Sequence, residues 1–370
     1  MKLFYAFPEP LPLERARGVQ VAHTAAELAR QGIAVELVHV PGRSRDPLGY
    51  YGIKTPHGLK LTPLSRSFPW PLSRLHSNRL FFWRFERLLG QSPDAIVLVR
   101  HLKLAAMLLG GRAQRRLVYE AHEVFSDTAQ PAKRIRQFAM ESLVMRRAAL
   151  VIANSAATAN RLRELYGERP IEVLPNGVDW PEVPPHKDWA NSVKHVLYAG
   201  SFFGWKGVSD LIRAGNELPG FRITLLGGTP EQIAREKEAI SPGGARIDFR
   251  GHVPHADVAA ALAQACIAVL PNRDDPDSRF TSPIKLFEYM AAGCAVVASD
   301  LPSLREVLEP DEAVWVRPGD PEDLAAGLRQ LADDPVRARR MGERAREKAR
   351  GFTWTARAET LIRLLRSLEH

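Results

Sequence analysis

The sequence contains little cysteine. Only two cysteines occur in its 370 residues, Cys266 and Cys294, and both stand inside apolar, strand-like stretches. Such a pair offers neither a disulfide framework nor a thiolate metal site. We therefore expect two small core residues in a reducing compartment.

Long apolar runs are also missing. No uninterrupted run approaches the roughly 20 apolar residues that a membrane-spanning helix needs. The apolar start of the chain is interrupted at Pro8, which disfavours a secretory signal. These absences lead us to expect a soluble, cytoplasmic protein.

The charge balance is basic, with a formal net charge of +9 and a pI near 9.7. An anionic partner would suit this balance, whether nucleic acid, nucleotide phosphates or an anionic membrane surface. The sequence lacks zinc-finger, helix-turn-helix and aromatic RNA-binding patterns, so we do not expect a nucleic-acid partner.

Short apolar runs alternate with amphipathic segments along the whole chain. In the first half they predict strands at 3–7, 33–40, 94–99, 116–119, 150–153 and 171–174. In the second half they predict strands at 195–199, 221–226, 246–249, 267–270, 295–298 and 313–316. Helical patterns, such as 19–31 and 135–147, lie between them. Continuous apolar strands separated by helices indicate α/β units with parallel sheets covered on both faces.

The length suits two domains of this Rossmann-like, doubly wound kind. Residues 180–185 read Trp-Pro-Glu-Val-Pro-Pro, whose prolines interrupt regular structure. We predict an N-terminal domain over 1–180, a hinge or linker over 181–192 and a C-terminal domain over 193–351. Ligand is expected where the strand ends of the two domains face each other.

The most informative segment lies late in the second domain. Residues 282–293 read Ser-Pro-Ile-Lys-Leu-Phe-Glu-Tyr-Met-Ala-Ala-Gly and lead into a buried strand. An acid early in such a short helix, Glu288, is well placed to hold a sugar hydroxyl beside a phosphate. An ordinary loop–helix–strand unit with an exposed Glu288 is the alternative.

A second segment offers a phosphate ligand. The predicted strand 195–199 ends at Gly200, and a glycine-bearing loop then leads to Lys206 just before a helix. A lysine at a helix N-terminus is unfavourable for the helix dipole unless an anion lies there too. Lys206 would supply a point charge to a diphosphate; a solvated loop lysine is the alternative.

Together these segments resemble the donor-binding signature of GT-B glycosyltransferases, family 4 in particular. The resemblance extends along almost the whole chain and includes the Pro175-Asn176-Gly177 turn. It implies two Rossmann-like domains facing a central cleft, with the final helix, within 352–370, crossing back to the first domain. It also implies retaining transfer of a hexosyl group from a UDP- or GDP-linked sugar to an unidentified glycan, lipid-linked or small-molecule acceptor.

The resemblance assigns individual residues. Glu288 would contact the ribose of the donor and Lys206 its phosphates, and we assign both to catalysis together with His122. The donor-binding set is Gly18, Gly200, Ser201, Lys206, Asp277, Arg279, Ser282, Pro283, Ile284, Lys285 and Glu288. His122 follows predicted strand 116–119 and would approach the transferred sugar; a histidine satisfied by local hydrogen bonds is the alternative.

Gly18 is a single glycine at the start of the helix that follows the first strand. Its backbone N–H could meet a phosphate or an acceptor there. Neither domain carries the three-glycine fingerprint with an acid about 20 residues later. This absence disfavours a nicotinamide-dependent oxidoreductase.

Two positions depart from the family pattern. Ser201 stands five residues before Lys206, where the family often has an Arg that contacts the phosphates. Phe280 stands eight positions before Glu288, where a second Glu normally contacts the donor sugar, unless Asp275 or Asp277 replaces it. The departures leave open a sugar-nucleotide-binding protein without transferase activity.

The sequence shows no evident metal site. Asp274-Asp275-Pro276-Asp277 is similar to the Asp-x-Asp motif of GT-A transferases but is more typical of a turn-forming loop. We therefore predict no cofactor and no metal. Lys206, with Lys285 or Arg279 and helix N-termini, would stabilise the leaving diphosphate.

Residues 73–88 mix basic and aromatic side chains at helical spacing. This composition is typical of an interfacial helix, able to contact anionic lipid on the cytoplasmic face of a membrane. The favoured alternative packs Phe81, Phe82 and Phe85 against the sheet of the first domain.

Overall fold

The chain divides into two compact units. The computed structural model describes residues 1–68, 77–111, 115–181, 186–275 and 284–369. Unit 1 comprises Met1–Asn176 and Trp354–His370, and unit 2 comprises Gly177–Thr353. Both termini therefore belong to unit 1. That residues 181–192 act as a hinge stays a prediction.

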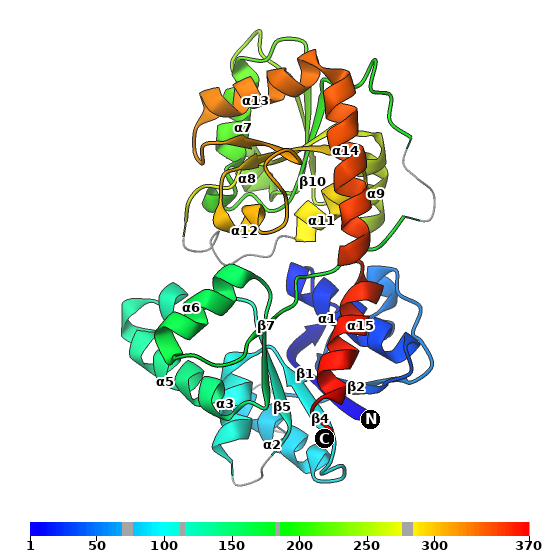
Figure 1. Cartoon of the computed structure of the whole chain (residues 1–370), viewed down its shortest axis with the longest axis vertical. Helices are drawn as coiled ribbons and strands as arrows, with labels where there is room; N and C mark the ends of the chain where they lie inside the picture. The colour runs from blue at the N-terminus through cyan, green and yellow to red at the C-terminus, as the bar shows by residue number, and fades with distance from the viewer. Residues whose placement is uncertain (69–76, 112–114, 182–185, 276–283, 370) are drawn as a thin grey trace. The chain divides into compact units, whose positions relative to one another are not determined.

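Unit 1 contains a seven-stranded parallel sheet in the order β3-β2-β1-β4-β5-β6-β7 (Figure 1). Its strands are β1 (Lys2–Leu11), β2 (Ala34–Pro41), β3 (Leu59–Pro63), β4 (Ile96–Val99), β5 (Leu117–Ala121), β6 (Leu150–Ala153) and β7 (Glu172–Val173). Its helices are α1 (Ala16–Arg30), η1 (Gly49–Tyr51), α2 (Asn78–Leu89), α3 (Leu102–Gly110), α4 (Phe125–Thr128), α5 (Pro131–Arg147), α6 (Ala156–Tyr166) and α15 (Trp354–Arg366).

Helices cover both faces of this sheet. Leu3 and Tyr5 of β1 belong to one core with residues of α1 and α15. Phe4, between them, meets the ring of Phe85 of α2 edge-on at 6.1 Å. Because successive side chains of a strand point to opposite faces, the two contacts lie on opposite sides of β1.

The last helix of the chain lies beside the first (Figure 1). Thr355 Oγ1 donates to Glu27 Oε1 at 3.0 Å, and Gln31 Nε2 donates to the Thr355 carbonyl oxygen at 3.0 Å. This packing confirms the predicted return of the final helix to the first domain.

Unit 2 contains a six-stranded parallel sheet in the order β10-β9-β8-β11-β12-β13. Its strands are β8 (His195–Ala199), β9 (Arg222–Leu226), β10 (Arg246–Gly251), β11 (Ile267–Leu270), β12 (Ala295–Ser299) and β13 (Ala313–Val316). Its helices are η2 (Gly204–Lys206), α7 (Val208–Asn216), α8 (Pro230–Lys237), α9 (His255–Gln264), α11 (Ile284–Ala291), α12 (Pro302–Arg305), α13 (Pro321–Asp333), α14 (Pro335–Ala349) and η3 (Arg350–Phe352).

Successive side chains of β8 again point to opposite faces of the sheet and pack in two different cores. Val196 and Tyr198 pack in a core with residues of α7 and α13, whereas Leu197 and Ala199 pack in a core with residues of α9 and α11. Both units thus have the predicted doubly wound α/β architecture.

The sequence did not predict β3. Its residues read Leu-Lys-Leu-Thr-Pro, and of these only Leu59 is buried. Within the described residues it is an edge strand, paired with β2 alone, so it needs no continuous apolar run and tolerates Pro63 at its end. Lys60 Nζ reaches Glu36 Oε1 of β2 at 2.9 Å, so polar contacts help to hold it.

The aromatic residues of α2 favour the packing alternative. Phe81 and Phe85 are fully buried, and Phe82 is half-buried. Trp83 remains exposed. The predicted segment began at residue 73, and residues 73–76 lie outside the described part of the chain.

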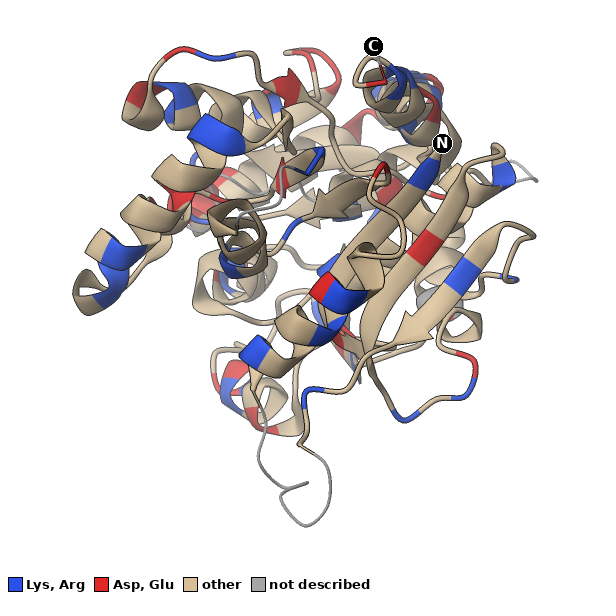
Figure 2. Cartoon of the chain, turned by 90° about the horizontal axis from the view of Figure 1, so that it is seen from below, with Lys and Arg blue, Asp and Glu red and all other residues tan. Residues whose placement is uncertain are grey.

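Basic and acidic residues are interspersed over many elements of the chain (Figure 2). No helix in the described ranges is both long enough and apolar enough to cross a membrane.

Candidate functional site

In unit 2 the strand order reverses direction between β8 and β11. Loops that leave the two strands at such a switch point diverge and open a ligand site at the carboxyl ends of the strands. Lys206 lies in η2, directly after β8. Lys285 and Glu288 lie on α11, which follows β11 in the chain. The three predicted residues therefore lie on the helices that follow the two strands of the switch point.

A glycine fixes the turn that carries Lys206. Gly207 has a φ of +68°, and a Cβ there would lie 1.7 Å from the carbonyl oxygen of Pro271. Only glycine fits such a left-handed position against another backbone. From the same loop after β11, the Arg273 N–H donates to the Trp205 carbonyl oxygen at 2.9 Å. The loop after β11 thus holds the turn in place.

Lys206 faces an aromatic ring and a second lysine. Its Nζ lies 3.9 Å from the ring centroid of Trp205, and no carboxylate among the described residues pairs with it. Burial, followed by the positive charge of Lys285, lowers the pKa of Lys206 to about 8. Two nearby ammonium groups leave this site attractive to an anion such as a diphosphate.

Lys285 and Glu288 form an ion pair along one face of α11. Lys285 Nζ donates to Glu288 Oε2 at 2.6 Å, and Glu288 is buried. The neighbouring Tyr289 anchors the helix, because its hydroxyl accepts from the Ala199 N–H at 2.8 Å. A hydrogen bond therefore joins the end of β8 directly to α11.

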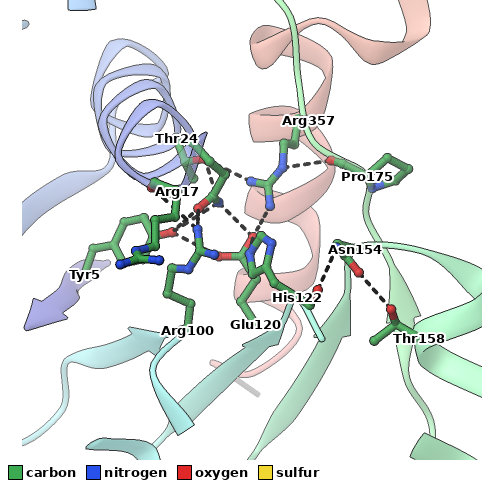
Figure 3. A network of polar contacts seen from close by, with 11 residues as sticks. Tyr5, Arg17, Thr24, Arg100, Glu120, His122, Asn154, Thr158, Pro175 and Arg357 are labelled. Carbon is green, nitrogen blue, oxygen red and sulfur yellow. Dashed lines mark hydrogen bonds and ion pairs between the residues drawn. The ribbon is translucent and has the colours of Figure 1, made fainter. Parts of the chain in front are cut away.

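Unit 1 holds a buried carboxylate near its own switch point, which lies between β1 and β4 (Figure 3). Glu120 of β5 accepts from the Tyr5 hydroxyl at 3.0 Å and from Gln20 Nε2 at 2.9 Å. It also forms an ion pair with Arg357 of α15. Four elements far apart in sequence, β1, α1, β5 and α15, thus meet at one carboxylate.

The network keeps Glu120 ionised. Burial opposes the charge, but the guanidinium groups of Arg357 and Arg100 outweigh burial and hold the pKa of Glu120 well below its usual value. Arg357 is itself held in place, since its Nε donates to the Pro175 carbonyl oxygen at 2.9 Å.

His122 follows β5 and lies at the edge of this network (Figure 3). Its Nε2 is 3.3 Å from Glu120 Oε1, and this contact lacks hydrogen-bond geometry. Burial, followed by the charge of Arg100, lowers the pKa of His122 to about 4, so its imidazole is neutral near pH 7. Asn154 Nδ2 donates to its carbonyl oxygen at 3.2 Å. A neutral ring, with its side chain 14% exposed, can hydrogen-bond a ligand hydroxyl.

Comparisons with known proteins agree with this architecture. The family model described as Glycosyltransferase Family 4 matches residues 18–180, and the model described as Glycosyl transferase-like matches residues 208–363. The chain belongs to the GT-B glycosyltransferases.

Curated relatives of this glycosyltransferase act on different substrates, as their names state. The chain is 31% identical over 228 residues to glycogen synthase of Mycobacterium tuberculosis, covering 58% of this chain and 53% of the relative. It is 28% identical over 283 residues to D-inositol 3-phosphate glycosyltransferase of Kineococcus radiotolerans, covering 65% and 61%. The chain spans little more than half the length of these relatives.

Solved structures share the fold of the glycosyltransferase. Sucrose-phosphate synthase from Thermosynechococcus elongatus matches with a TM-score of 0.79 at 20% identity, over 99% of this chain and 98% of that one. HepE from Anabaena, in complex with UDP and glucose, matches with a TM-score of 0.75 at 19% identity, over 99% and 100%. At such identities these matches show the fold alone.

The structure pairs Lys285 with Glu288 and places Lys206 within electrostatic reach of Lys285. Gly200 follows β8, and its N–H donates to the Leu226 carbonyl oxygen at 2.9 Å. Ser201 is exposed, and Ile284 begins α11. Outside the described residues lie Asp277, Arg279, Phe280, Ser282 and Pro283. Contact of any of these residues with a donor stays a prediction.

Gly18 lies in the first turn of α1, where packing accounts for it. Its N–H donates to the Arg15 carbonyl oxygen at 2.8 Å. A Cβ would lie 2.5 Å from both the Leu13 carbonyl oxygen and the Tyr51 hydroxyl oxygen. The predicted contact of Gly18 with a phosphate or acceptor stays a prediction.

Sequence reasoning did not find the residues that position the site. These are Arg100, Glu120, Arg273, Tyr289 and Arg357. A signal existed for two of them: Glu120 interrupts an apolar strand, and Arg357 falls on the inward face of an amphipathic helix. Identifying their partners required the tertiary structure.

Proposed function

We propose that the chain is a retaining glycosyltransferase that moves a hexosyl group from a UDP- or GDP-linked sugar to an acceptor. The observation that carries this proposal is the arrangement of Lys206, Lys285 and Glu288 at the switch point of unit 2. Two ammonium groups suit a diphosphate, and an adjacent buried carboxylate suits ribose hydroxyls. The titles of the HepE structures, which name UDP and UDP-glucose, support the same class of donor.

In the proposed reaction, the lysines neutralise the departing diphosphate and no metal ion or cofactor takes part. His122, neutral near pH 7, donates or accepts a hydrogen bond with the transferred sugar. The acceptor is unidentified, and a glycan, a lipid-linked sugar and a small molecule are all compatible with the proposal. We place the enzyme in the cytoplasm, in peripheral contact with an anionic membrane surface.

A mass-spectrometric screen of nucleotide sugars tests this function. The full chain should release free nucleotide from one donor, and transferred sugar should keep the anomeric configuration of that donor. Nucleotide binding without release or transfer, under any acceptor mixture, would instead favour a sugar-nucleotide-binding protein. Inversion at the anomeric carbon would contradict the retaining mechanism while leaving the transferase intact.

A further inference from the structure

Helix α5 carries two exposed apolar side chains, Ile135 and Phe138. Every residue from Pro131 to Arg136 is exposed, Ile135 is 87% exposed and Phe138 is 44% exposed. At about 100° per residue, Phe138 lies roughly 60° around the helix from Ile135, so the two share an outward face. The ring of Phe138 is braced at 5.0 Å from the ring of Tyr166, on α6. The outward face of α5, as we use the term, is Arg134, Ile135, Arg136 and Phe138.

The charged residues of α5 are nearly all basic. It carries Lys133, Arg134, Arg136, Arg146 and Arg147, and Glu141 as its single acid. Glu141 points inward, where it accepts from the Phe125 N–H at 2.7 Å and the Tyr166 hydroxyl at 2.7 Å. The acid therefore fastens α5 to the start of α4 and offers no charge to the outward face.

Few of these basic groups have acidic partners. Arg134 lies 3.9 Å from Asp127, a distance at which an exposed pair contributes little. Among the described residues, no carboxylate forms an ion pair with Lys133, Arg136 or Arg147. Exposed Ile135 is thus flanked by Arg134 and Arg136, each about 100° away around the helix.

We propose that the outward face of α5 docks on an anionic lipid bilayer. This inference deepens the membrane contact in the proposed function and rests on it. Ile135 and Phe138 would enter the boundary between headgroups and acyl chains, while the flanking basic groups contact anionic headgroups. Nucleic acid suits the face less well, because its most exposed member is an aliphatic side chain rather than a ring that can stack on a base.

Helix α14 of unit 2 shows that basic composition alone does not produce such a face. Its Val336 is 61% exposed and lies among several arginines. Acids nevertheless interleave with them: Arg339 Nε lies 2.8 Å from Glu343, and Arg344 forms an ion pair with Asp311. Helix α14 therefore offers a matched control: it also exposes apolar and basic residues, but nearby acids neutralise part of its charge.

The position of α5 suits an acceptor carried by the membrane. Strand β5 ends at Ala121, His122 follows, and the chain reaches α5 through the single-turn helix α4. The exposed half of α5 is the half that begins nearest to His122 along the chain. Within unit 1, a bilayer on α5 would thus lie on the segment that continues from the candidate catalytic histidine.

Flotation with vesicles tests the proposal. The wild-type chain should float with vesicles of phosphatidylcholine mixed with phosphatidylglycerol at low salt, and not with phosphatidylcholine alone. Replacing Arg134 and Arg136 with Gln should weaken partitioning about fivefold for each charge removed. Ile135→Ser should weaken it further, whereas Val336→Ser with Arg337→Gln on α14 should leave it unchanged. All replaced side chains are exposed, and unchanged melting temperatures will verify folding.

Nucleotide titration of the same variants separates this inference from the proposed function. Normal nucleotide binding without vesicle binding by the wild type would overturn the inference and leave the donor site standing. Equal vesicle binding by wild type and α5 variants would overturn it too. Binding of single-stranded RNA that the α5 variants lose, without vesicle binding, would reassign the face to nucleic acid.

Discussion

Glu288 is subject to two opposing effects. Its carboxylate is proposed to accept hydrogen bonds from ribose, yet it also offsets the charge of Lys285 at 2.6 Å. Charge-assisted hydrogen bonds contribute roughly 1.5–3 kcal/mol. Without Glu288, Lys285 would be free to attract the diphosphate more strongly. The Lys285 side chain is 31% exposed, however, so solvent screens this added attraction. The lost ribose contact should therefore dominate.

Glu288→Ala should thus lower nucleotide affinity about tenfold or more, with the fold intact. Calorimetry should also show that the variant no longer distinguishes a ribonucleotide from its deoxyribose analogue. Glu238→Ala, at an exposed acid of unit 2, is the matched control. Wild-type affinity in Glu288→Ala would refute the ribose assignment.

His122→Ala should lower kcat about 10²-fold, the scale expected for one positioned polar group. Nucleotide affinity should change much less, because the imidazole is proposed to act on the sugar in the transition state. Steady-state kinetics beside calorimetry will separate the two quantities. Full activity with a lower melting temperature would show that His122 only braces its turn.

The same residue predicts a pH dependence of stability. The pKa of His122 is lowered from 6.5 to about 4 in the folded chain, so the unfolded chain binds its proton first as pH falls. Its contribution to the free energy of unfolding is complete above pH 6.5 and is lost toward pH 4. As pH falls across this range, the free energy of unfolding measured in urea should decline less steeply for His122→Ala than for wild type. His57→Ala, at an exposed histidine, should follow the wild-type curve.

At the scale of elements, α15 connects the end of the chain to the polar network of unit 1. Arg357 is its buried charged residue, and Glu120 of β5 is the partner. Removing one member of a buried ion pair typically costs about 3–5 kcal/mol, because the remaining charge stays buried and unpaired.

Arg357→Met should therefore lower the free energy of unfolding by about that amount. The double variant Arg357→Met with Glu120→Gln should recover part of the loss, because no buried carboxylate is left without Arg357, although Arg100 loses the anion of Glu120. Arg363→Met, at an exposed position on the same helix, should stay within about 0.5 kcal/mol of wild type. Denaturant unfolding measures all three; equal stability of Arg357→Met and Arg363→Met would contradict the role of this pair.

The same elements show how far sequence patterns reach. Apolar runs predicted the strands of both sheets because buried parallel strands are apolar on both faces. They missed β3, whose edge position lets Lys60 and Thr62 face solvent or polar partners. Local glycine and helix patterns predicted Lys206 and Glu288 as donor contacts, and these roles stay predictions. Sequence patterns have a limit in unit 1. They could not pair Glu120 with Arg357, since that contact joins residues far apart in sequence.

At the scale of the whole molecule, the two sheets each place polar residues at the carboxyl ends of strands near a switch point. Unit 2 presents cations and unit 1 presents a neutral histidine beside an ionised acid. The cations of unit 2 support the proposed diphosphate contact there, and the contact of His122 with a sugar stays a prediction.

If the lysines neutralise the leaving diphosphate, excess chelator should leave turnover within about twofold of the untreated enzyme, because no divalent cation is needed for charge stabilisation. A coupled assay of nucleotide release measures this. Loss of activity on chelation, restored by Mg²⁺ or Mn²⁺, would direct attention to the Asp274–Asp275 loop as a metal ligand.

The most direct measurement is a calorimetric titration of UDP and GDP into the full chain and its Lys206→Met variant. The wild type should bind one of the nucleotides and take up protons near pH 8, because a bound diphosphate favours the charged form of Lys206, whose pKa is about 8. Lys206→Met should bind about tenfold or more weakly and without this proton uptake. Lys194→Met, at an exposed lysine, should match the wild type. Equal affinity in Lys206→Met, or no nucleotide bound by the wild type, would contradict the proposed donor site.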